Sequence, residues 1–496
     1  MGDVENIVWA SDATGLAAHI RKGDVSPAEV MEAAIARAEA VNPYINAIAE
    51  HLYDSARAAA KKVHRAAPFA GVPMAIKDLG ISINGVPIHW GSRVRPNIST
   101  EDSTLVERFR AAGFVPLATS TTSEFGLRLV TETERFGVTR NPWNTGHVTG
   151  GSSGGSAALV AAGVVPVAHA SDGGGSIRVP AACCGLVGMK PSRGRVPFTP
   201  DFLEGWFGLL AQHVVTRSVR DSAAILDLAS APDPYSPYQA SQPAGTFSEA
   251  AHRRPKGLRI GIYGTSPLGL AVSDETQTAL ERAADLAREA GHRVEEIDLP
   301  VTRDFFADFA RIVAVSFAGQ MRMEGVRLRG AGTLGRIARV LRRYGELTGG
   351  GEFSASVLRM QEVTHGILTQ TAAFDAVLMP VIAHPPLPCG GLDPRGLDLL
   401  SEQLLDALHL TPALRLSPLI DKLIDQSLWF THWPAIQNVT GQPAIALPVH
   451  VTGEGLPLGI QAVGRMGDEE TLFSLAAQLE AQVGWRDRRA PLLEPQ

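Results

Sequence analysis

Two serines in glycine-rich turns and one lysine after an apolar run are the residues with the clearest capacity for chemistry. Ser152 lies in TGGSSGGS, Ser176 in SDGGGSIRVPA and Lys77 in GVPMAIKDL. A serine hydroxyl is a weak nucleophile, and it attacks a carbonyl efficiently only when a nearby base takes its proton. Lysine can be that base when burial in an apolar pocket lowers its pKa from about 10.4 to roughly 7–8. Together the three residues indicate hydrolysis by a serine nucleophile.

Each of these features also has a structural interpretation when it is taken alone. GGSSGG is equally typical of a flexible linker, and a lysine at a strand end is usually a solvated charge. A phosphate-binding loop is disfavoured, because GxxxxGK[ST] needs a lysine directly after its last glycine and none follows these glycine-rich turns. Residues 150–154 satisfy GxSxG, but a nucleophile elbow needs a buried strand directly before its serine. Residues 141–147 are polar and turn-forming, so the elbow at Ser152 is kept only as an alternative.

Several segments in order resemble the amidase signature family. They are GVPMAIKDL, RNPWN, TGGSSGGSAALVAAG, SDGGGSIRVPAACCGLVGMKPSRGRV, LAQHVVTRSVRDSAAIL, FDAVLMPVIAHPP, NVTGQPAIALPV and GIQAVGR. The resemblance spans most of the chain and implies one large α/β/α domain, a mixed central β-sheet covered by helices on both faces. It also implies a Ser-cisSer-Lys triad, with Ser176 as nucleophile, Ser152 as bridge and Lys77 as base. The implied activity is hydrolysis of amide bonds without a cofactor or metal.

The glycines before the nucleophile are the expected oxyanion hole. In this interpretation the backbone N–H groups of Gly173, Gly174, Gly175 and Ser176 face the carbonyl oxygen, and each donor contributes about 3 kcal/mol. A tight turn is the structural alternative, and glycine suits both. Many family members carry threonine where Gly173 stands, so a side-chain contact from that position is absent here.

Three further residues match family positions beside the nucleophile. We expect Asp172 and Arg178 to pair and to fix the loop that carries Ser176, with surface charges as the alternative. We expect Ser153 to hydrogen-bond near Lys77. The adjacent Cys183 and Cys184 are interpreted as small core residues, not nucleophiles.

The substrate is predicted to be an uncharged, fairly apolar small molecule. Phe125 lies where the family usually lines its acyl pocket, and Trp206 and Phe207 belong to an aromatic segment that could wall the site; core packing is equally compatible. The layout is most similar to bacterial 6-aminohexanoate cyclic dimer hydrolases, aryl acylamidases and urethanases. A carbamate needs the same acyl-enzyme chemistry plus loss of carbon dioxide, so the sequence does not separate an amide from a carbamate substrate.

The elements that must position these residues alternate between helix and strand. A Ser-Pro-Ala-Glu capping box predicts a helix beginning at Ser26. Residues 135–156 are predicted to be loop until a helix begins near Ser156. The other expected elements are helices over 52–63, 103–112 and 274–290, and strands over 71–76, 114–118, 164–170, 258–263, 293–299 and 374–381.

Length alone would predict roughly three domains in 496 residues. The family resemblance overrides that expectation and implies a single amidase domain over 1–496. Its expected parts are an N-terminal helical part (1–65), the signature core (66–230), a proline-rich loop excursion (231–256) and the remainder of the sheet with the pocket cover (257–496). The composition, 45% hydrophobic and 19% charged, is typical of a well-buried globular protein.

Composition also disfavours several partners. A net charge of −6 gives no basic field for nucleic acid. The apolar run over 156–170 is interrupted and falls short of the ~18 residues of a membrane span, and the first residues do not resemble a secretory signal. Three cysteines without a CxxC motif, and histidines without HExxH, predict a cytoplasmic protein with no metal site. A homodimer is left open.

Two other functions are weighed. The glutamine-hydrolysing A subunit of the tRNA-dependent amidotransferase shares the triad motifs, but no residues are identified here that would bind the two charges of a free amino acid. A non-enzymatic hypothesis uses the arginine-rich segment 319–344, where apolar residues recur at helical spacing, as a docking surface for a membrane or protein. An ordinary amphipathic helix with solvated charges is the alternative.

Overall fold

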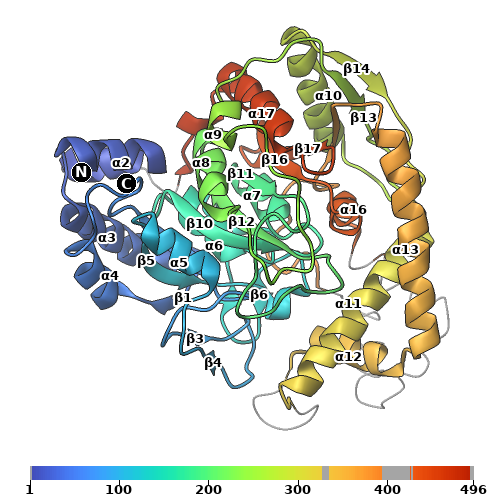
Figure 1. Ribbon diagram of the computed structural model, residues 1–496, viewed down its shortest axis with the longest axis horizontal. Helices are drawn as coiled ribbons and strands as arrows, with labels where there is room; N and C mark the ends of the chain where they lie inside the picture. The colour runs from blue at the N-terminus through green and yellow to red at the C-terminus, as the bar shows by residue number, and fades with distance from the viewer. Residues whose placement is uncertain (1–2, 327–333, 394–424, 426–427, 492–496) are drawn as a thin grey trace.

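One large mixed sheet organises the molecule (Figure 1). The computed structural model describes residues 3–326, 334–393, 425 and 428–491. The sheet order is β1 (Ile48–His51), β5 (Val115–Ser120), β2 (Pro73–Lys77), β10 (Val167–Asp172), β12 (Ala211–Thr216), β11 (Val187–Lys190), β16 (Ala444–Val451), β17 (Pro457–Gly464), β15 (Ala376–Pro380), β13 (Arg259–Ile262) and β14 (Arg293–Glu296). Strand β2 is parallel to β5 and β10, and β13 is parallel to β14 and β15; the other neighbours are antiparallel.

Two sets of helices cover the sheet. Helices α6 (Gly154–Ala161) and α7 (Arg178–Cys184) contact each other, with α6 against β2 and β10 and α7 against β16 and β17. A second set, α8 (Val219–Ala229), α10 (Asp274–Glu289) and α17 (Glu469–Val483), contacts strands β11 to β17. This arrangement confirms the α/β fold with a mixed central sheet. The remaining helical elements are α1 (Asp3–Ala10), α2 (Ala13–Lys22), α3 (Pro27–Ile45), α4 (Tyr53–Ala60), α5 (Thr104–Ala111), η1 (Glu124–Gly126), α9 (Phe247–Ala250), α11 (Arg303–Met323), α12 (Arg336–Leu347), α13 (Gly350–Thr371), α16 (Trp433–Thr440) and η3 (Trp485–Asp487).

Local sequence signals explain several of these elements. The capping box at the start of α3 forms as predicted, with the Ser26 hydroxyl accepting from the Glu29 N–H and the Glu29 carboxylate accepting from the Ser26 N–H. The strand expected over 258–263, the helix over 274–290 and the strand over 293–299 form as β13, α10 and β14, a β-α-β unit in which the Ser273 side chain caps α10. Strands from both sides of residues 231–256 join the same sheet. The division of the chain into domain parts stays a prediction.

The polar segment before Ser152 differs from the expected loop. It contains two short hairpins, β6 (Glu132–Thr133) with β7 (Gly137–Val138), and β8 (Arg140–Asn141) with β9 (Asn144–Val148). The Val148 N–H donates to the carbonyl oxygen of Leu387, so a partner distant in sequence stabilises this extended backbone. Within the described residues, strand β9 pairs with β8, forms one isolated bridge from His147 to Pro388 and lies outside the main sheet, unlike the buried strand that an elbow at Ser152 would require. The other small sheet joins β3 (Pro87–Ile88) and β4 (Asn97–Ile98).

The register of the central strands sets the position of the site. Strands β2 and β10 are parallel neighbours, with Met74 opposite Val167 and Ala75 opposite Ala168. Because the carboxyl ends of parallel strands meet at one edge of a sheet, Lys77 and Asp172 end their strands on the same side. All residues of both strands are buried, so the groups at these ends are held by a rigid core.

Helices α11, α12 and α13 extend from the sheet as a separate group (Figure 1). Part of the arginine-rich segment, 327–333, lies outside the described residues. In α12 the apolar side chains of Ala338 and Leu341 pack into a cluster with Phe317 and Met321 of α11. These apolar side chains therefore have a partner inside the chain, in contrast to the free apolar face that docking would need.

Across the part of the chain that the structure describes, no helix combines the length and apolarity needed to cross a membrane.

Candidate active site

Lys77 ends strand β2 in a fully enclosed position. Its side chain is 1% exposed, and its Nζ donates to Ser152 Oγ at 2.7 Å and to Ser171 Oγ at 3.0 Å. Burial lowers the pKa of Lys77 to about 7, although the nearby Asp172 charge acts in the opposite direction. About half of the amine is therefore neutral near pH 7, and the neutral form is the one that can accept a proton.

Ser152 lies in the turn between β9 and α6. The peptide bond between Gly151 and Ser152 is cis, as the family resemblance implies. Glycine is needed here for space, because a Cβ on Gly151 would lie 2.7 Å from the Val130 backbone. The turn is held from outside as well, since the Ser123 N–H donates to the Ser152 carbonyl oxygen at 3.2 Å.

Ser176 lies in the turn that joins β10 to α7. The Ser153 N–H donates to the Ser176 carbonyl oxygen at 3.3 Å, so the two serine turns are in direct contact. Ser176 is 4% exposed. Among the described residues the structure gives no hydrogen bond between Ser152 Oγ and Ser176 Oγ. The geometry thus joins Lys77 to Ser152 and brings the Ser176 backbone beside them.

Asp172 and Arg178 form the predicted ion pair, and both are completely buried. The guanidinium holds the carboxylate at two points, with Nε 2.9 Å from Oδ2 and Nη2 3.0 Å from Oδ1. Burial alone would raise the pKa of Asp172, but the charge and hydrogen bonds of Arg178 hold it below its ordinary value. The pair ties the end of β10 to the first turn of α7, on either side of Ser176.

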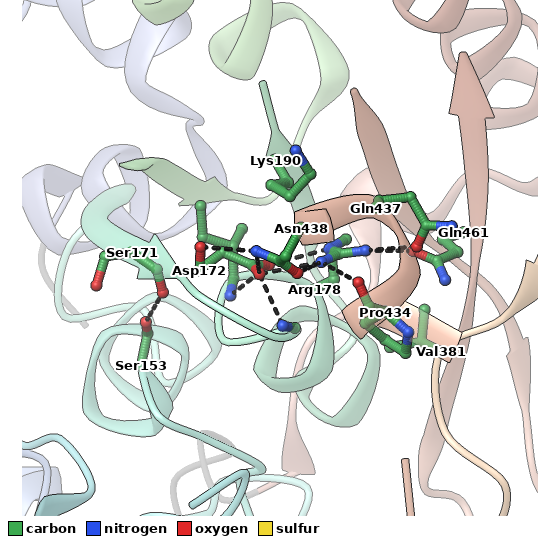
Figure 2. Close-up of polar contacts among 12 residues, drawn as sticks. Ser153, Ser171, Asp172, Arg178, Lys190, Val381, Pro434, Gln437, Asn438 and Gln461 are labelled. Atoms are coloured by element: carbon green, nitrogen blue, oxygen red, sulfur yellow. Dashed lines mark hydrogen bonds and ion pairs between the residues drawn. The ribbon is translucent and has the colours of Figure 1, made fainter. Parts of the chain in front are cut away.

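Residues from the C-terminal part complete this network (Figure 2). Asn438 accepts from Arg178 Nη2 at 2.7 Å and donates to Asp172 Oδ1 at 2.9 Å. Gln437 and Gln461 accept from Arg178 Nη1 at 3.0 and 2.8 Å. These three amides were not predicted from the sequence, although NVTGQ and GIQAVGR, the segments that resemble the family, contain Asn438 and Gln461.

The carbonyl oxygen of Ser171 accepts hydrogen bonds from two side chains of the site. Ser153 Oγ donates to the Ser171 carbonyl oxygen at 3.2 Å (Figure 2), and Lys77 Nζ donates to the same oxygen at 3.3 Å. Ser153 therefore lies near Lys77 as expected. Ser171 contacts Lys77 through its hydroxyl as well; it is the first residue of the quoted SDGGGS segment, but no role was predicted for it.

The four expected oxyanion donors are not equivalent. The Gly175 N–H donates to Asp172 Oδ1 at 2.7 Å, so it supports the turn and does not point freely toward a substrate. No described residue accepts a hydrogen bond from the N–H of Gly173, Gly174 or Ser176. Gly175 is thus a correction to the predicted set, because the carboxylate accepts its N–H.

The three predicted pocket aromatics lie in different surroundings. Phe125 is buried, and its ring stacks on Trp90 at 5.6 Å and meets Phe317 at 5.2 Å between centroids. Trp206 lies against Gly173. Phe207 is 51% exposed and its ring contacts Phe353 of α13, so it lies farther out than the other two.

The other candidate nucleophiles and ligands are unsuited to the site. Cys183 and Cys184 are buried, and burial raises the pKa of both thiols. Within the described ranges, no three His, Cys, Asp or Glu side chains gather closely enough to hold a metal ion.

Comparisons with known proteins find similar amide hydrolases. The family model named Amidase matches residues 29–473. The 6-aminohexanoate-cyclic-dimer hydrolase of Paenarthrobacter ureafaciens is 34% identical over 504 residues, which cover 98% of this chain and 98% of that protein. A solved structure of a 6-aminohexanoate cyclic dimer hydrolase has a TM-score of 0.87 at 32% identity, covering 100% of both chains. A bacterial aryl acylamidase of the amidase signature family has a TM-score of 0.84 at 26% identity, covering 99% of this chain and 100% of that one.

Proposed function

This chain belongs to the amidase signature family of amide hydrolases, and we propose that it cleaves its substrate through an acyl-enzyme on Ser176. In this proposal Ser152 relays protons and Lys77 is the base. The observation that carries it is the 2.7 Å hydrogen bond from Lys77 Nζ to Ser152 Oγ, inside a pocket where burial lowers the pKa of Lys77 to about 7. A neutral lysine in this position can accept a proton from Ser152 near neutral pH.

The first half of the reaction forms the acyl-enzyme. Ser176 Oγ attacks the carbonyl carbon while its proton passes to Ser152 Oγ, and the Ser152 proton passes to Lys77 Nζ. The carbonyl oxygen becomes an oxyanion, for which the N–H groups of Gly173, Gly174 and Ser176 are the donors. When the C–N bond breaks, Ser152 returns a proton to the leaving nitrogen and regains one from Lys77, because an amide anion is a poor leaving group.

The second half releases the acyl group. Water attacks the Ser176 ester, and its proton follows the same path through Ser152 to Lys77. The tetrahedral intermediate then breaks its bond to Ser176 Oγ, which recovers a proton from Ser152, and Ser152 regains one from Lys77. A carbamate substrate would follow the same steps, with the released carbamic acid losing carbon dioxide.

The substrates we propose are aryl and alkyl amides, aminohexanoate oligomers and small carbamates. Two related proteins support the amide part of this range, a 6-aminohexanoate-cyclic-dimer hydrolase and an aryl acylamidase. We further propose a cytoplasmic location, supported by three cysteines that are all free thiols. Neither a cofactor nor a metal takes part in the steps above.

The test is hydrolysis of a panel of anilides, alkyl amides, aminohexanoate oligomers, carbamates and glutamine, with a chelator present. Ser176→Ala and Lys77→Ala are expected to lose at least about 10³-fold in kcat/KM. The exposed Lys61→Ala is the matched control and should keep wild-type rates. Activity that survives in Ser176→Ala would overturn the assignment and favour Ser152 as nucleophile. Turnover of glutamine alone, and only with added partner subunits, would favour an amidotransferase subunit.

A further inference from the structure

The backbone conformation at positions 173 and 174 does not require glycine. Gly175 has a φ of +129°, which a residue with a side chain rarely adopts. Neither Gly173 nor Gly174 has a positive φ, so their backbone conformation is open to ordinary residues. Some other feature must explain why the two positions lack a side chain.

That feature is the close approach of aromatic rings. A Cβ on Gly173 would lie 2.7 and 2.9 Å from Cζ3 and Cε3 of Trp206, and 2.7 Å from Cδ2 of Leu210. A Cβ on Gly174 would lie 3.0 Å from Cζ of Phe309. These distances are shorter than ordinary carbon contacts of about 3.5–4.0 Å, so the rings rest directly on the two glycines.

The two rings come from separate segments of the chain. Phe309 belongs to helix α11, and Trp206 to the loop between β11 and β12. Both side chains are only partly buried, and each lies against a glycine of the turn that carries Ser176. Trp206 also has a φ of +52°, followed by +57° at Phe207. A bulky residue in this conformation is uncommon, and such residues cluster at active sites, ligand clamps and switch regions.

We propose that Trp206 and Phe309 form an aromatic clamp that holds a planar apolar group of the substrate beside the scissile carbonyl. Gly173 and Gly174 are glycines in order to admit these rings. The clamp selects aryl amides over small aliphatic amides, because a flat ring stacks on exposed aromatic surface and a short alkyl group does not. This inference rests on the proposed function, since it takes Ser176 as the reacting residue.

The substrate test uses acetanilide, benzamide and acetamide with Trp206→Ala and Phe309→Ala. Each variant should lower kcat/KM for at least one ring-bearing amide by about tenfold, through KM, and change acetamide by less than about twofold. Leu203→Ala is the matched control, because Leu203 lies in the same loop with 53% of its side chain exposed. Equal losses on all three amides, or no loss on either ring-bearing amide, would overturn the clamp.

A double-mutant cycle tests the contact without any assay of activity. Gly173→Ala should lower Tm in the wild-type background and lower it by a smaller amount beside Trp206→Ala, because the ring contacts of its Cβ are then gone and only the contact with Leu210 remains. An equal loss in both backgrounds would refute the contact. A wild type that hydrolyses none of the three amides would contradict the proposed function, and the thermal cycle would then still decide whether the ring fills the space above Gly173.

Discussion

The pH profile of hydrolysis should follow the protonation of Lys77. Burial lowers the pKa of Lys77 to about 7, and only the neutral amine can accept a proton. For a single titration with that midpoint, the neutral fraction rises from roughly 9% at pH 6 to roughly 91% at pH 8. We therefore expect kcat/KM for an uncharged amide to rise about tenfold over this interval.

Removing one acceptor of the ammonium should move that profile to lower pH. In Ser171→Ala, Lys77 Nζ loses the Ser171 hydroxyl 3.0 Å away. A hydrogen bond to a charged group is stronger than one to a neutral group by about 1 kcal/mol, so the protonated form loses more stabilisation. That difference lowers the pKa, and the midpoint should fall by about 0.7 pH unit. At pH 6 the active fraction would then rise to roughly a third.

The assay is kcat/KM for an uncharged anilide between pH 5.5 and 9. Ser156→Ala is the matched control, because its hydroxyl hydrogen-bonds the His169 carbonyl oxygen and Ser120 and not Lys77. Its midpoint should equal that of the wild type. A midpoint that rises in Ser171→Ala, or one that shifts equally in both variants, would refute Lys77 as the titrating base.

Two further substitutions test the energetics of the site. Lys77→Met should abolish activity yet raise the free energy of unfolding at pH 7 by on the order of 2 kcal/mol. Burial lowers the pKa of Lys77 in the folded protein below its value in the unfolded protein. At any pH below the unfolded-state pKa, the lysine therefore destabilises the folded state. The gain should shrink as pH rises from 7 toward 10.5, and equilibrium denaturation that shows a loss at pH 7 would contradict this account. Arg178→Met should cost about 3–5 kcal/mol, because it leaves the buried Asp172 carboxylate unpaired. Arg178→Lys should recover little of the lost stability, since an ammonium cannot replace the two-point contact of the guanidinium with the carboxylate. Near-complete recovery of stability in urea unfolding would argue against this role of Arg178.

The sequence predicted what depends on neighbouring residues. The capping box at Ser26 and the buried strand ending at Lys77 are local patterns, and both form. Strand β9 was missed because its side chains do not alternate between apolar and polar, and its backbone is held by Leu387, far along the chain. Long-range packing of this kind leaves no local pattern.

The site shows the same division between local and distant information. Asp172 and Arg178 are six residues apart and were predicted to pair, as they do. The amides of Asn438 and Gln461, more than 250 residues away, were not predicted, because nothing near Arg178 in sequence indicates what surrounds it. The hydrogen bond from the Gly175 N–H to the Asp172 carboxylate was not predicted either, since a run of glycines in the sequence does not show where each N–H points.

Intact-protein and peptide mass spectrometry after reaction with a slowly deacylating carbamate would show whether Ser176 carries the acyl group. We expect one covalent adduct on the peptide that contains Ser176, formed faster above pH 7 and absent from Ser176→Ala. An adduct on Ser152, or turnover without any adduct on Ser176 in rapid-quench samples, would contradict it.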